Sequence, residues 1–429
     1  MPLHPKHWPL SLRVLAALVV GILLGVYGGA EPYFYQLDNG DLGQIGLLII
    51  RLLKALAVPL IFFSILDAFV RAPISARSGG RLIMICLFNV SVAFVIGLTL
   101  MNVIKPGLAW RGHIDQLLGK LAIPATAPSL PAQVSLDPLQ NIGSYVPTSL
   151  MEPMLHNNVI SVVLIALLFG AALGSLKHAQ AGQIEIDVSP LEALISVIYQ
   201  LLVKVLSWVV HTVPLAVLCL VAQAVGKAGL SIFSELASYA GIIVAGLCLH
   251  GLLYSSLAAW IAGDKSPRTY LGQGIDAVLT GLSTNSSLAT VPITLECLKR
   301  MGVSDRSARL AVCAGTNLNN DGVTLYEAMT ALFLAQAIGF DLNAGQQIVI
   351  VLASLIAGAG IAGIPEAGLI VLPLVLSAAG LPETVVAAAI PLIAPIDWVI
   401  ARLRSAVNVL SDMLVAILLD AWDRRSPSG

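Results

Sequence analysis

The chain has 429 residues, of which 57% are hydrophobic and only 11% are charged, and its formal net charge at pH 7 is −1. Because a soluble globular protein carries about 25% charged residues, the sequence lacks the polar surface that a water-soluble protein of this length needs. It has no basic stripe that could neutralise phosphates, which excludes nucleic acid as a partner. The cysteines and histidines show no metal-ligand or disulfide spacing, so we expect no resident cofactor and no zinc site.

Six apolar segments precede the last third of the chain, and each is long enough for a bilayer crossing of about 20 residues. The first is too long for the apolar core of a signal peptide and is followed by further spans, so we expect it to remain as a transmembrane helix. The fifth is too long for one perpendicular crossing, which predicts a tilt or a bend at Pro214. Residues 106–150 are polar and predict a long external loop with short helical pieces. The six segments lie near residues 9–30, 42–70, 82–104, 156–176, 190–225 and 234–263.

The distribution of Lys and Arg predicts the orientation, since short cytoplasmic loops are enriched in basic residues. Residues 14–50 contain none, and the basic groups of the long 106–150 loop are the main exception. We expect a plasma membrane of the bacterial inner-membrane type, with both termini in the cytoplasm. This arrangement places the following Lys and Arg residues on the cytoplasmic side. These are Lys6, Arg13, Arg71, Arg77, Arg81, Lys265, Arg268, Lys299, Arg300, Arg306, Arg309, Arg424 and Arg425.

Two apolar segments of the last third are interrupted by small and polar residues. Residues 270–298 contain GLSTNSSLATVP between basic flanks, and residues 346–378 contain AGAGIAGIPEAG without a basic flank. These patterns predict two re-entrant helical hairpins that enter the membrane from opposite sides. Each precedes a long helix with polar residues, at 306–338 and 383–424, and such an inverted repeat is typical of a transporter with a midplane binding site. The alternative is a pair of ordinary spans with flexible kinks.

One polar stripe runs along residues 383–424, because Asp397, Ala401, Arg404, Asn408 and Asp412 recur at spacings of three and four. Charged groups inside a membrane helix are costly, so this stripe is expected to face a polar cavity or to pair internally. Arg404 suits a solute carboxylate, because a guanidinium fork matches carboxylate geometry. Asp412 suits a hard cation such as Na⁺. The alternative is a structural contact of Arg404 with Asp397 or Asn408.

The helix predicted at 306–338 carries a polar run, GTNLNNDGVTLYE, in apolar surroundings. Its glycines permit local unwinding that frees backbone carbonyls, and carbonyls with one carboxylate predict a sodium site. An Asn-rich helix cap is the alternative. The polar residues are Asn317, Asn319, Asn320 and Asp321, and the glycines are Gly315 and Gly322.

The two hairpin tips supply hydroxyls, backbone N–H groups and glycines that let a ligand approach closely. Two half-helix N-termini can direct their dipoles at a carboxylate. Singly these patterns are typical of ordinary turns, and only their pairing indicates a site. The first tip contains Ser283, Thr284, Asn285, Ser286, Ser287 and Thr290, and the second Gly358, Gly360, Gly363, Gly368 and Glu366.

In these residues the chain resembles the dicarboxylate/amino-acid:cation symporter family, which includes archaeal aspartate and mammalian glutamate transporters. The resemblance covers most of the chain and is strongest from about 275 to 415. The family's Asn-Met-Asp-Gly-Thr motif is matched by Asn319-Asn320-Asp321-Gly322-Val323, and its serine-rich first tip by Ser286, Ser287 and Thr290-Val291-Pro292. Its Gly-Val-Pro-Gly-like second tip is matched by Gly363-Ile364-Pro365-Glu366. An Asp, a substrate-binding Arg, an Asn and a sodium-binding Asp of its eighth helix fall on Asp397, Arg404, Asn408 and Asp412.

The resemblance implies which residues hold the ligands. Sodium ligands are expected at Asn319, Asp321, Asn408 and Asp412. Substrate contacts are expected at Ser286, Ser287, Gly363, Pro365, Glu366, Asp397, Ala401, Arg404, Ser405 and Asn408.

Several positions depart from the family pattern. Ala401 stands where the amino-acid transporters carry an Asp that binds the amino group. Asn320 and Val323 replace the Met and Thr of the motif. Asn285 stands in place of the archaeal first-hairpin Arg, and Arg402 occupies the eighth-helix position where the animal relatives carry theirs.

The resemblance implies an all-α integral membrane protein of eight transmembrane helices and two hairpins, assembled as a homotrimer with an elevator-type motion. Residues 1–70 and 106–225 are expected to form the scaffold, and residues 71–105 and 226–429 the moving transport domain. We expect a secondary active symporter that couples cation influx, Na⁺ or alternatively H⁺, to uptake of a small anionic solute. Because Ala401 removes the amino-binding carboxylate while Arg404 is kept, a C4-dicarboxylate is expected, with an acidic amino acid as the alternative.

Two other functional classes are weighed against the symporter. A passive anion channel would need no coupling cation. An intramembrane hydrolase would use Ser283 or Ser286 as a nucleophile or Asp321 and Asp397 as an acid pair. Residues 265–429 contain no histidine, so a Ser–His dyad would need His250, and no paired-aspartate protease motif is present. We therefore do not expect an enzyme.

Overall fold

The computed structural model describes residues 10–29, 31–32, 38–71, 76–111, 147, 149–155, 159–179, 187–316, 318–360, 367–381 and 383–425. Nearly all of these residues are helical, and no strand occurs among them, which confirms the all-α prediction. Most of the predicted 106–150 loop lies outside this set. Its described part begins with a short 3₁₀ helix, Pro106–Trp110, and α6 (Glu152–Leu155) lies just beyond its end.

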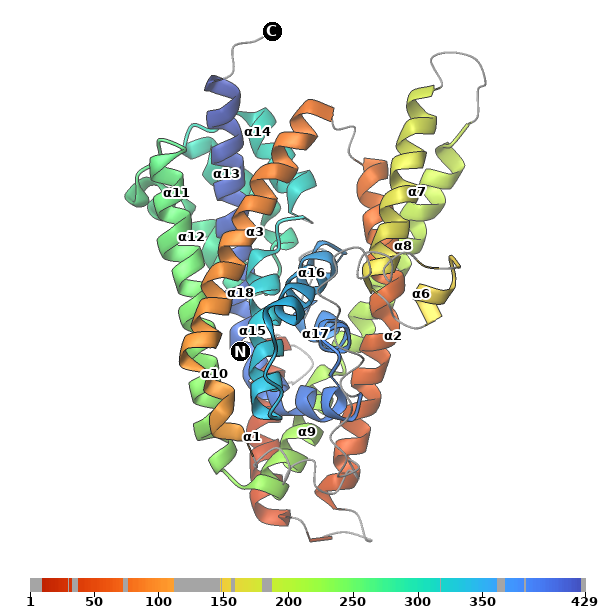
Figure 1. Ribbon diagram of the computed structural model, residues 1–429, viewed down its shortest axis with the longest axis vertical. Helices are drawn as coiled ribbons and strands as arrows, with labels where there is room; N and C mark the ends of the chain where they lie inside the picture. Colours follow the sequence, from red (N-terminus) through yellow and green to blue (C-terminus); the bar gives the residue numbers. More distant parts are fainter. Residues whose placement is uncertain are drawn as a thin grey trace, which may run out of the picture.

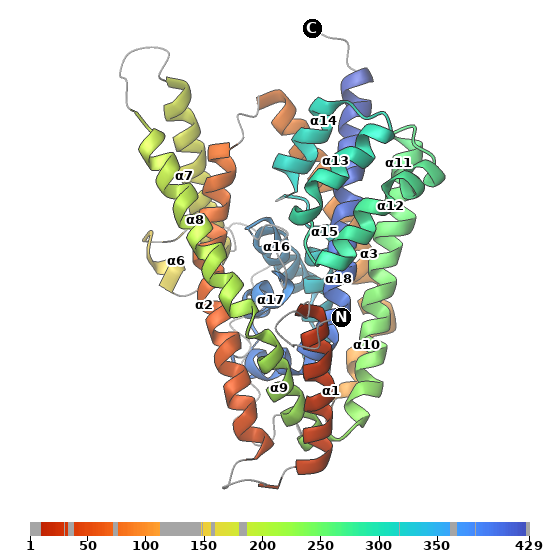
Figure 2. The ribbon, with the colours of Figure 1, turned by 180° about the vertical axis from the view of Figure 1, so that it is seen from behind.

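The first four predicted spans correspond to single helices, α1 (Leu10–Gly28), α2 (Asn39–Arg71), α3 (Ala76–Ile104) and α7 (Val159–Ala179). The fifth is divided into α8 (Ser189–Val210) and α9 (Val213–Ala228). The division falls just before Pro214, whose ring and missing N–H are tolerated in the first turn of a helix. The helix is therefore interrupted where the sequence predicts a tilt or a bend, and Figure 2 shows α8 leading into α9.

The sixth predicted span consists of α10 (Ser231–Cys248), a π-helical stretch at Leu249–Tyr254 and α11 (Ser255–Ile261). By length and composition alone, four helices of the described residues can cross a membrane: Gly79–Ile104, Ser189–Val209, Leu236–Ile261 and Val399–Arg425. Several others carry shorter apolar stretches, such as Leu12–Gly28 and Ala344–Gly358. The helices therefore fit a membrane protein. Four of the described helices are long and apolar enough to span a membrane, fewer than the eight spans that we expected.

The last third forms two pairs of short helices, each followed by a polar helix. The first pair is α12 (Pro267–Thr284) and α13 (Val291–Arg300), and the second is α16 (Ala344–Gly360) and α17 (Ala367–Ala378); the members of each pair pack together. α18 (Glu383–Arg425) is continuous over 43 residues. The helix expected at 306–338 is instead divided into α14 (Asp305–Arg309), a π-helical stretch at Leu310–Gly315 and α15 (Asp321–Ala337). The non-helical residues 316 and 318–320 agree with the predicted unwinding beside Gly315 and Gly322.

The helices pack in two groups with the second pair between them. α1, α2, α7, α8 and α9 contact one another on one side, and α3, α10, α12, α15 and α18 contact one another on the other. α16 and α17 touch α15 of one group and α2 of the other. Both ribbon views show this arrangement, with α16 and α17 between α2 and α15 (Figures 1 and 2). Every residue of α15 is buried.

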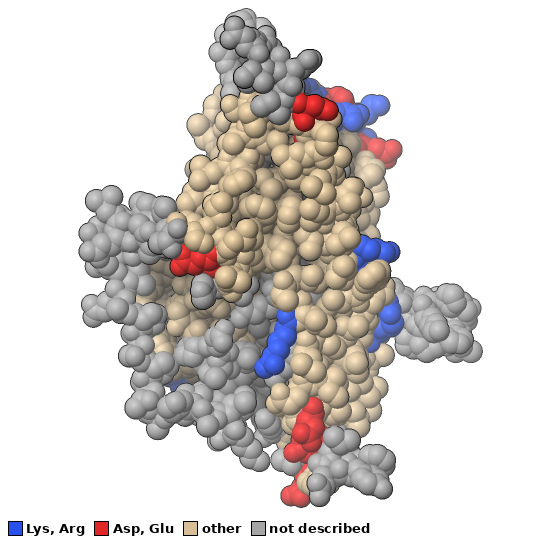
Figure 3. All heavy atoms as spheres, turned by 90° about the vertical axis from the view of Figure 1, so that its right-hand side faces the viewer, with Lys and Arg blue, Asp and Glu red and all other residues tan. Residues whose placement is uncertain are grey.

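The exposed surface is largely apolar, with charged side chains at both ends and a few in the middle (Figure 3). In the space-filling view, tan atoms cover most of the described middle of the molecule (Figure 3). Ion pairs of Arg81 with Asp423 (2.6 Å) and of Arg425 with Asp264 (3.4 Å) bring together the start of α3, the turn after α11 and the end of α18. These predicted cytoplasmic groups therefore share one end of the bundle.

Candidate functional site

The polar stripe of α18 faces the protein interior. Asp397, Ala401, Arg404, Asn408 and Asp412 each expose 3% or less of their surface. Their spacing keeps them on one face of the helix, and Arg404 on this face contacts α15 and α17. Since ionisable groups are rarely buried in a membrane protein without a role, the stripe marks the candidate site.

Arg404 is held by an ion pair, an aromatic ring and a close backbone. Its Nη2 donates to Asp397 Oδ2 at 3.0 Å. Its guanidinium carbon lies 4.0 Å from the centroid of the Tyr326 ring of α15, a cation–π geometry. Gly368 of α17 packs so closely that a Cβ there would overlap the guanidinium. The contact with Asp397, one of the alternatives left open by the sequence, is therefore present, and it fixes the direction of the guanidinium.

A second polar cluster lies about two turns further along α18, around Asp321 and Asp412. Asp412 accepts hydrogen bonds from Thr316 and, at 3.2 Å, from Asn319. Ser411 accepts from Asn319 at 2.9 Å and donates to Asp321 Oδ2 at 2.5 Å. We call these five residues the carboxylate network. Thr316 and Asn319 lie in the non-helical residues just before α15, and there they face Ser411 and Asp412 of α18.

The carboxylate network also receives two side chains from other helices. Asn89 of α3 donates to Asp321 Oδ2 at 2.5 Å and also to Ser411. His250, in the π-helical stretch after α10, has its Nε2 2.9 Å from the same carboxylate oxygen. All of these groups are buried. π-Helical turns are frequent at functional sites, and this one turns a histidine toward the network.

The oxygen atoms of the network suit a hard cation. Asp321 Oδ1 and Asn89 Oδ1 are buried and have no hydrogen-bond partner among the described residues. Carboxylate, amide and carbonyl oxygens are the ligands that hard cations prefer, and transporters hold Na⁺ with carbonyls freed at broken helices. In the described part of the chain, no group of three or more His, Cys, Asp and Glu side chains is arranged so that it could hold a metal ion. The donors therefore fit an alkali cation better than a transition metal.

Asn408 links the two clusters to the second helix pair. Its Oδ1 accepts from the Gly322 N–H at 2.8 Å, and its Nδ2 donates to Asn320 Oδ1 at 3.3 Å. Asn320 in turn donates from Nδ2 to the Gly358 carbonyl of α16 at 2.8 Å. Asn408 thus bonds within the protein at both ends of its amide.

The first helix pair reaches α18 through its tip. Asn285 adopts a left-handed conformation (φ 53°) at the end of α12, and its Oδ1 accepts from Ser405 at 3.0 Å. Ser286 Oγ accepts from the Ala289 N–H at 3.2 Å. Ser287 is buried, and its Oγ has no hydrogen-bond partner among the described residues. The tip therefore lies against the stripe and leaves one buried hydroxyl for another ligand.

Four of the expected site residues fall beyond what the structure describes. Gly363, Pro365 and Glu366 of the second tip and Asn317 of the polar run lie outside the described residues. Their roles remain predictions from the sequence.

Four buried polar residues were missed by the sequence reasoning as site residues: Asn89, Ser411, His250 and Glu327. The sequence signal for each was a polar side chain inside an apolar run. The sequence reasoning followed the polar residues of α18 and therefore missed their partners on α3 and in the π-helical stretch after α10. Glu327 of α15 is fully buried, and neither carboxylate oxygen has a hydrogen-bond partner among the described residues. His250 contacts Asp321, while Ser283 Oγ donates to the Leu279 carbonyl.

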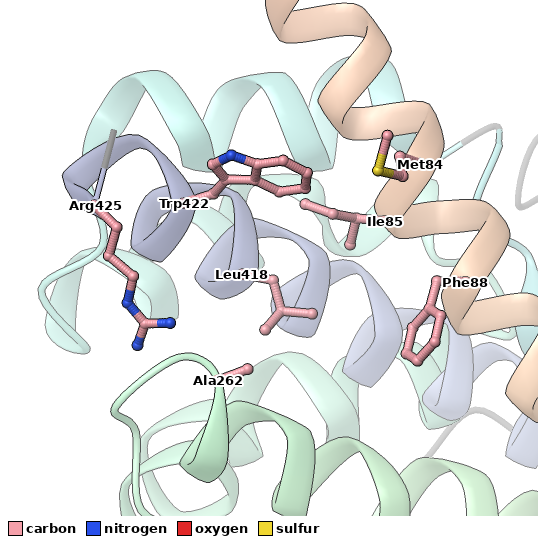
Figure 4. A pocket seen from close by; sticks show the side chains of 7 residues that line it. All are labelled: Met84, Ile85, Phe88, Ala262, Leu418, Trp422 and Arg425. Atoms are coloured by element: carbon pink, nitrogen blue, oxygen red, sulfur yellow. The ribbon is translucent and has the colours of Figure 1, made fainter. Parts of the chain in front are cut away.

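A groove elsewhere in the molecule contains none of the expected site residues. It has a volume of about 670 Å³ and lies between α3, the end of α11 and the end of α18. Its lining is apolar apart from Arg425, as Figure 4 shows. A groove without buried polar groups does not suit a small anion, so it is not the candidate site.

The chain is similar to known transporters. The chain matches the sodium:dicarboxylate symporter family over residues 10–422. Excitatory amino acid transporter 3 of Mus musculus is 29% identical to it over 95% of this chain and 84% of its own length. Excitatory amino acid transporter 1 of Ambystoma tigrinum is 28% identical over 96% and 83%, and that of Mus musculus is 36% identical over 62% and 48%. Because the family match spans nearly the whole chain, the chain belongs to the sodium:dicarboxylate symporter family.

Proposed function

We propose that this protein is a sodium-coupled symporter that takes up an acidic amino acid across a plasma membrane. The observation that carries the proposal is the juxtaposition on α18 of a buried guanidinium, Arg404, and the oxygen-rich carboxylate network around Asp321 and Asp412. The first suits a solute carboxylate and the second a cation. Because an anion site and a cation site lie next to each other, binding of either ligand can raise the affinity for the other, as symport requires.

The choice of solute differs from the first expectation. Ala401 led us to expect a C4-dicarboxylate, whereas the relatives described above are excitatory amino acid transporters, which favours the acidic amino acid. A buried ammonium needs a nearby carboxylate. Ala401 cannot supply one, and we assign this role to Glu366 of the second tip or to the buried Glu327.

A C4-dicarboxylate is the second candidate, supported by Ala401 itself. This side chain is buried, with 1% exposed, at the position where the amino-acid transporters of the family carry an amino-binding Asp. A pocket without that carboxylate would suit a dianion better than a zwitterion.

The proposed transport cycle is an elevator-type motion of one group of helices against the other. We assign α1, α2, α7, α8 and α9 to a scaffold that forms a homotrimer, and α3, α10 to α15 and α18 with both hairpins to a domain that moves across the membrane. The two helix pairs would be re-entrant, with tips meeting at the stripe of α18. Support comes from the packing of the helices in two groups and from the position of α16 and α17 between them. Both termini are assigned to the cytoplasm.

Uptake into proteoliposomes tests the proposal. An inward sodium gradient should drive concentrative accumulation of labelled L-aspartate or L-glutamate, and gradients of K⁺ or choline should not. Succinate and malate serve as the matched solutes without an ammonium. Accumulation that follows only the solute's own gradient would indicate a passive channel, and accumulation driven only by a proton gradient would replace Na⁺ by H⁺.

A further inference from the structure

We propose that the groove between α3, the end of α11 and the end of α18 holds one anionic phospholipid, with its phosphate at Arg425 and an acyl chain along the apolar lining. Both α3 and α11 pack against α18, so one group of helices forms the whole groove. The groove takes no part in the proposed symport. The proposed orientation enters only in the choice of leaflet, which is the cytoplasmic one.

The apolar lining of the groove follows two helices. Met84 and Phe88 lie one turn apart on α3, and Leu418 and Trp422 lie one turn apart on α18. The two α3 side chains are exposed, although both are large and apolar. Lipid tails are as apolar as a Leu side chain, so in a membrane protein a lining of this kind suits an acyl chain.

The charged residue of the lining stands at one end of the groove. Figure 4 shows Arg425 at this end and Phe88 at the other, with Leu418 between them. The ion pair of Arg81 with Asp423 joins the start of α3 to the end of α18, so both helices run into the membrane from here. Phe88 follows Arg81 by seven residues, and Leu418 precedes Arg425 by seven. At 1.5 Å per residue the lining is about 10 Å long, compared with about 15 Å for half of the hydrocarbon core.

Arg425 can bind a phosphate without losing a strong partner. Its Nη2 lies 3.4 Å from Asp264 Oδ2, and both side chains are largely exposed. Exposed ion pairs contribute little to stability, so a phosphate can compete with this carboxylate. A guanidinium also has five N–H donors in a fork that matches phosphate oxygens. The head group of an anionic lipid therefore has a suitable partner at the end of the groove.

Trp422 indicates that this end lies at the level of the lipid head groups. It precedes Arg425 by about one turn of α18, and Trp is enriched at the interface between membrane and water. The guanidinium carbon of Arg81 lies 5.6 Å from the centroid of its ring, so a second basic group stands beside it. Basic pockets between transmembrane helices on the cytoplasmic side bind anionic head groups. These residues therefore favour an anionic lipid over a zwitterionic one.

Native mass spectrometry of the full-length protein in detergent tests the proposal, with phosphatidylglycerol or phosphatidylcholine added. The wild type should bind phosphatidylglycerol about fivefold more tightly, the effect of one Arg beside an anionic head group. Arg425→Gln should bind the two lipids with equal affinity. Arg424→Gln is the matched control and should keep the preference, because Arg424 is similarly exposed (52%), pairs with Asp420 at 3.4 Å and lies outside the lining.

A second pair of variants tests the apolar part of the groove. Ala262→Phe places a large side chain in the lining and should weaken the binding of both lipids. Ile261→Phe is its control, because Ile261 is the preceding residue, is exposed and lies outside the lining. It should bind both lipids as the wild type does.

Equal affinity of the wild type for the two lipids would overturn the proposal. So would a preference that survives in Arg425→Gln, or one that Arg424→Gln loses to the same extent, since the overall positive charge of this end would then explain it. Unchanged lipid binding in Ala262→Phe would place the lipid outside the groove. A changed oligomer mass in Arg425→Gln would make the groove a contact between copies of the chain instead. No sodium and no solute enter these measurements, so the proposed function is tested separately.

Discussion

Arg404 and Asp397 form an ion pair across two turns of α18, with Nη2 of the arginine 3.0 Å from Oδ2 of the aspartate and both side chains buried. Such a pair costs desolvation and returns little net stability, whereas loss of one partner is strongly destabilising. The pair therefore orients a guanidinium that the membrane interior would otherwise penalise.

Arg404→Ala should abolish binding of any solute with two carboxylates. It should also lower the thermal stability, because a buried Asp397 without its partner costs about 3–5 kcal/mol. Calorimetric binding and thermal unfolding of the purified protein measure the two effects. Adding Asp397→Asn should restore stability but not binding. Arg300→Ala, which removes an exposed pair with Asp276, should change neither by more than about 1 kcal/mol. Normal affinity in Arg404→Ala would disprove the assignment.

Gly368→Ala should also abolish solute binding, because the added methyl group would overlap the Arg404 guanidinium. In an unconstrained helix this substitution would instead stabilise by about 1 kcal/mol. Gly272→Ala in α12 is the control, since open space surrounds that position. A Gly368→Ala protein that binds the solute as the wild type does would show that α17 does not press on Arg404.

Asp412→Asn should weaken the dependence of solute affinity on sodium. In the wild type this affinity should rise with sodium concentration, since coupling between two ligands is reciprocal. Asp276→Asn is the control, because Asp276 lies at the exposed pair with Arg300. Titrations of solute at several sodium concentrations give the result. Equal wild-type affinity with and without sodium at pH 5–8 would exclude sodium coupling, and affinity that rose only on acidification would favour protons.

Ala401→Asp and Glu366→Gly separate the two solute classes. If the solute is an acidic amino acid held by Glu366, Glu366→Gly should destroy binding and Ala401→Asp should partly restore it in the double variant. If the solute is a C4-dicarboxylate, Ala401→Asp should weaken binding by like-charge repulsion, and Glu366→Gly should be tolerated. Binding of L-aspartate compared with succinate is the measurement. Loss of L-aspartate binding in Glu327→Gln, with Glu366→Gly tolerated, would move the ammonium site to α15.

The sequence by itself determined the class of the protein and most of its helices. Apolar runs of spanning length exclude a soluble protein, and the spacing of Asp397, Arg404, Asn408 and Asp412 placed them on one face before any coordinates were known. Periodicity reports such features because a helix repeats every 3.6 residues. The bend before Pro214 and the unwinding near Asn319 followed from local backbone chemistry of the same kind.

Only the tertiary structure decided which side chains meet. Asn89, His250 and Asp321 are far apart in the sequence, and their contact at one carboxylate depends on how α3, α10 and α15 pack around α18. The bond from Asn320 to Gly358 likewise joins two helices that no periodicity connects. Sequence patterns describe the faces of single helices, whereas a binding site is made where faces of different helices come together, and that depends on packing between residues distant in the chain.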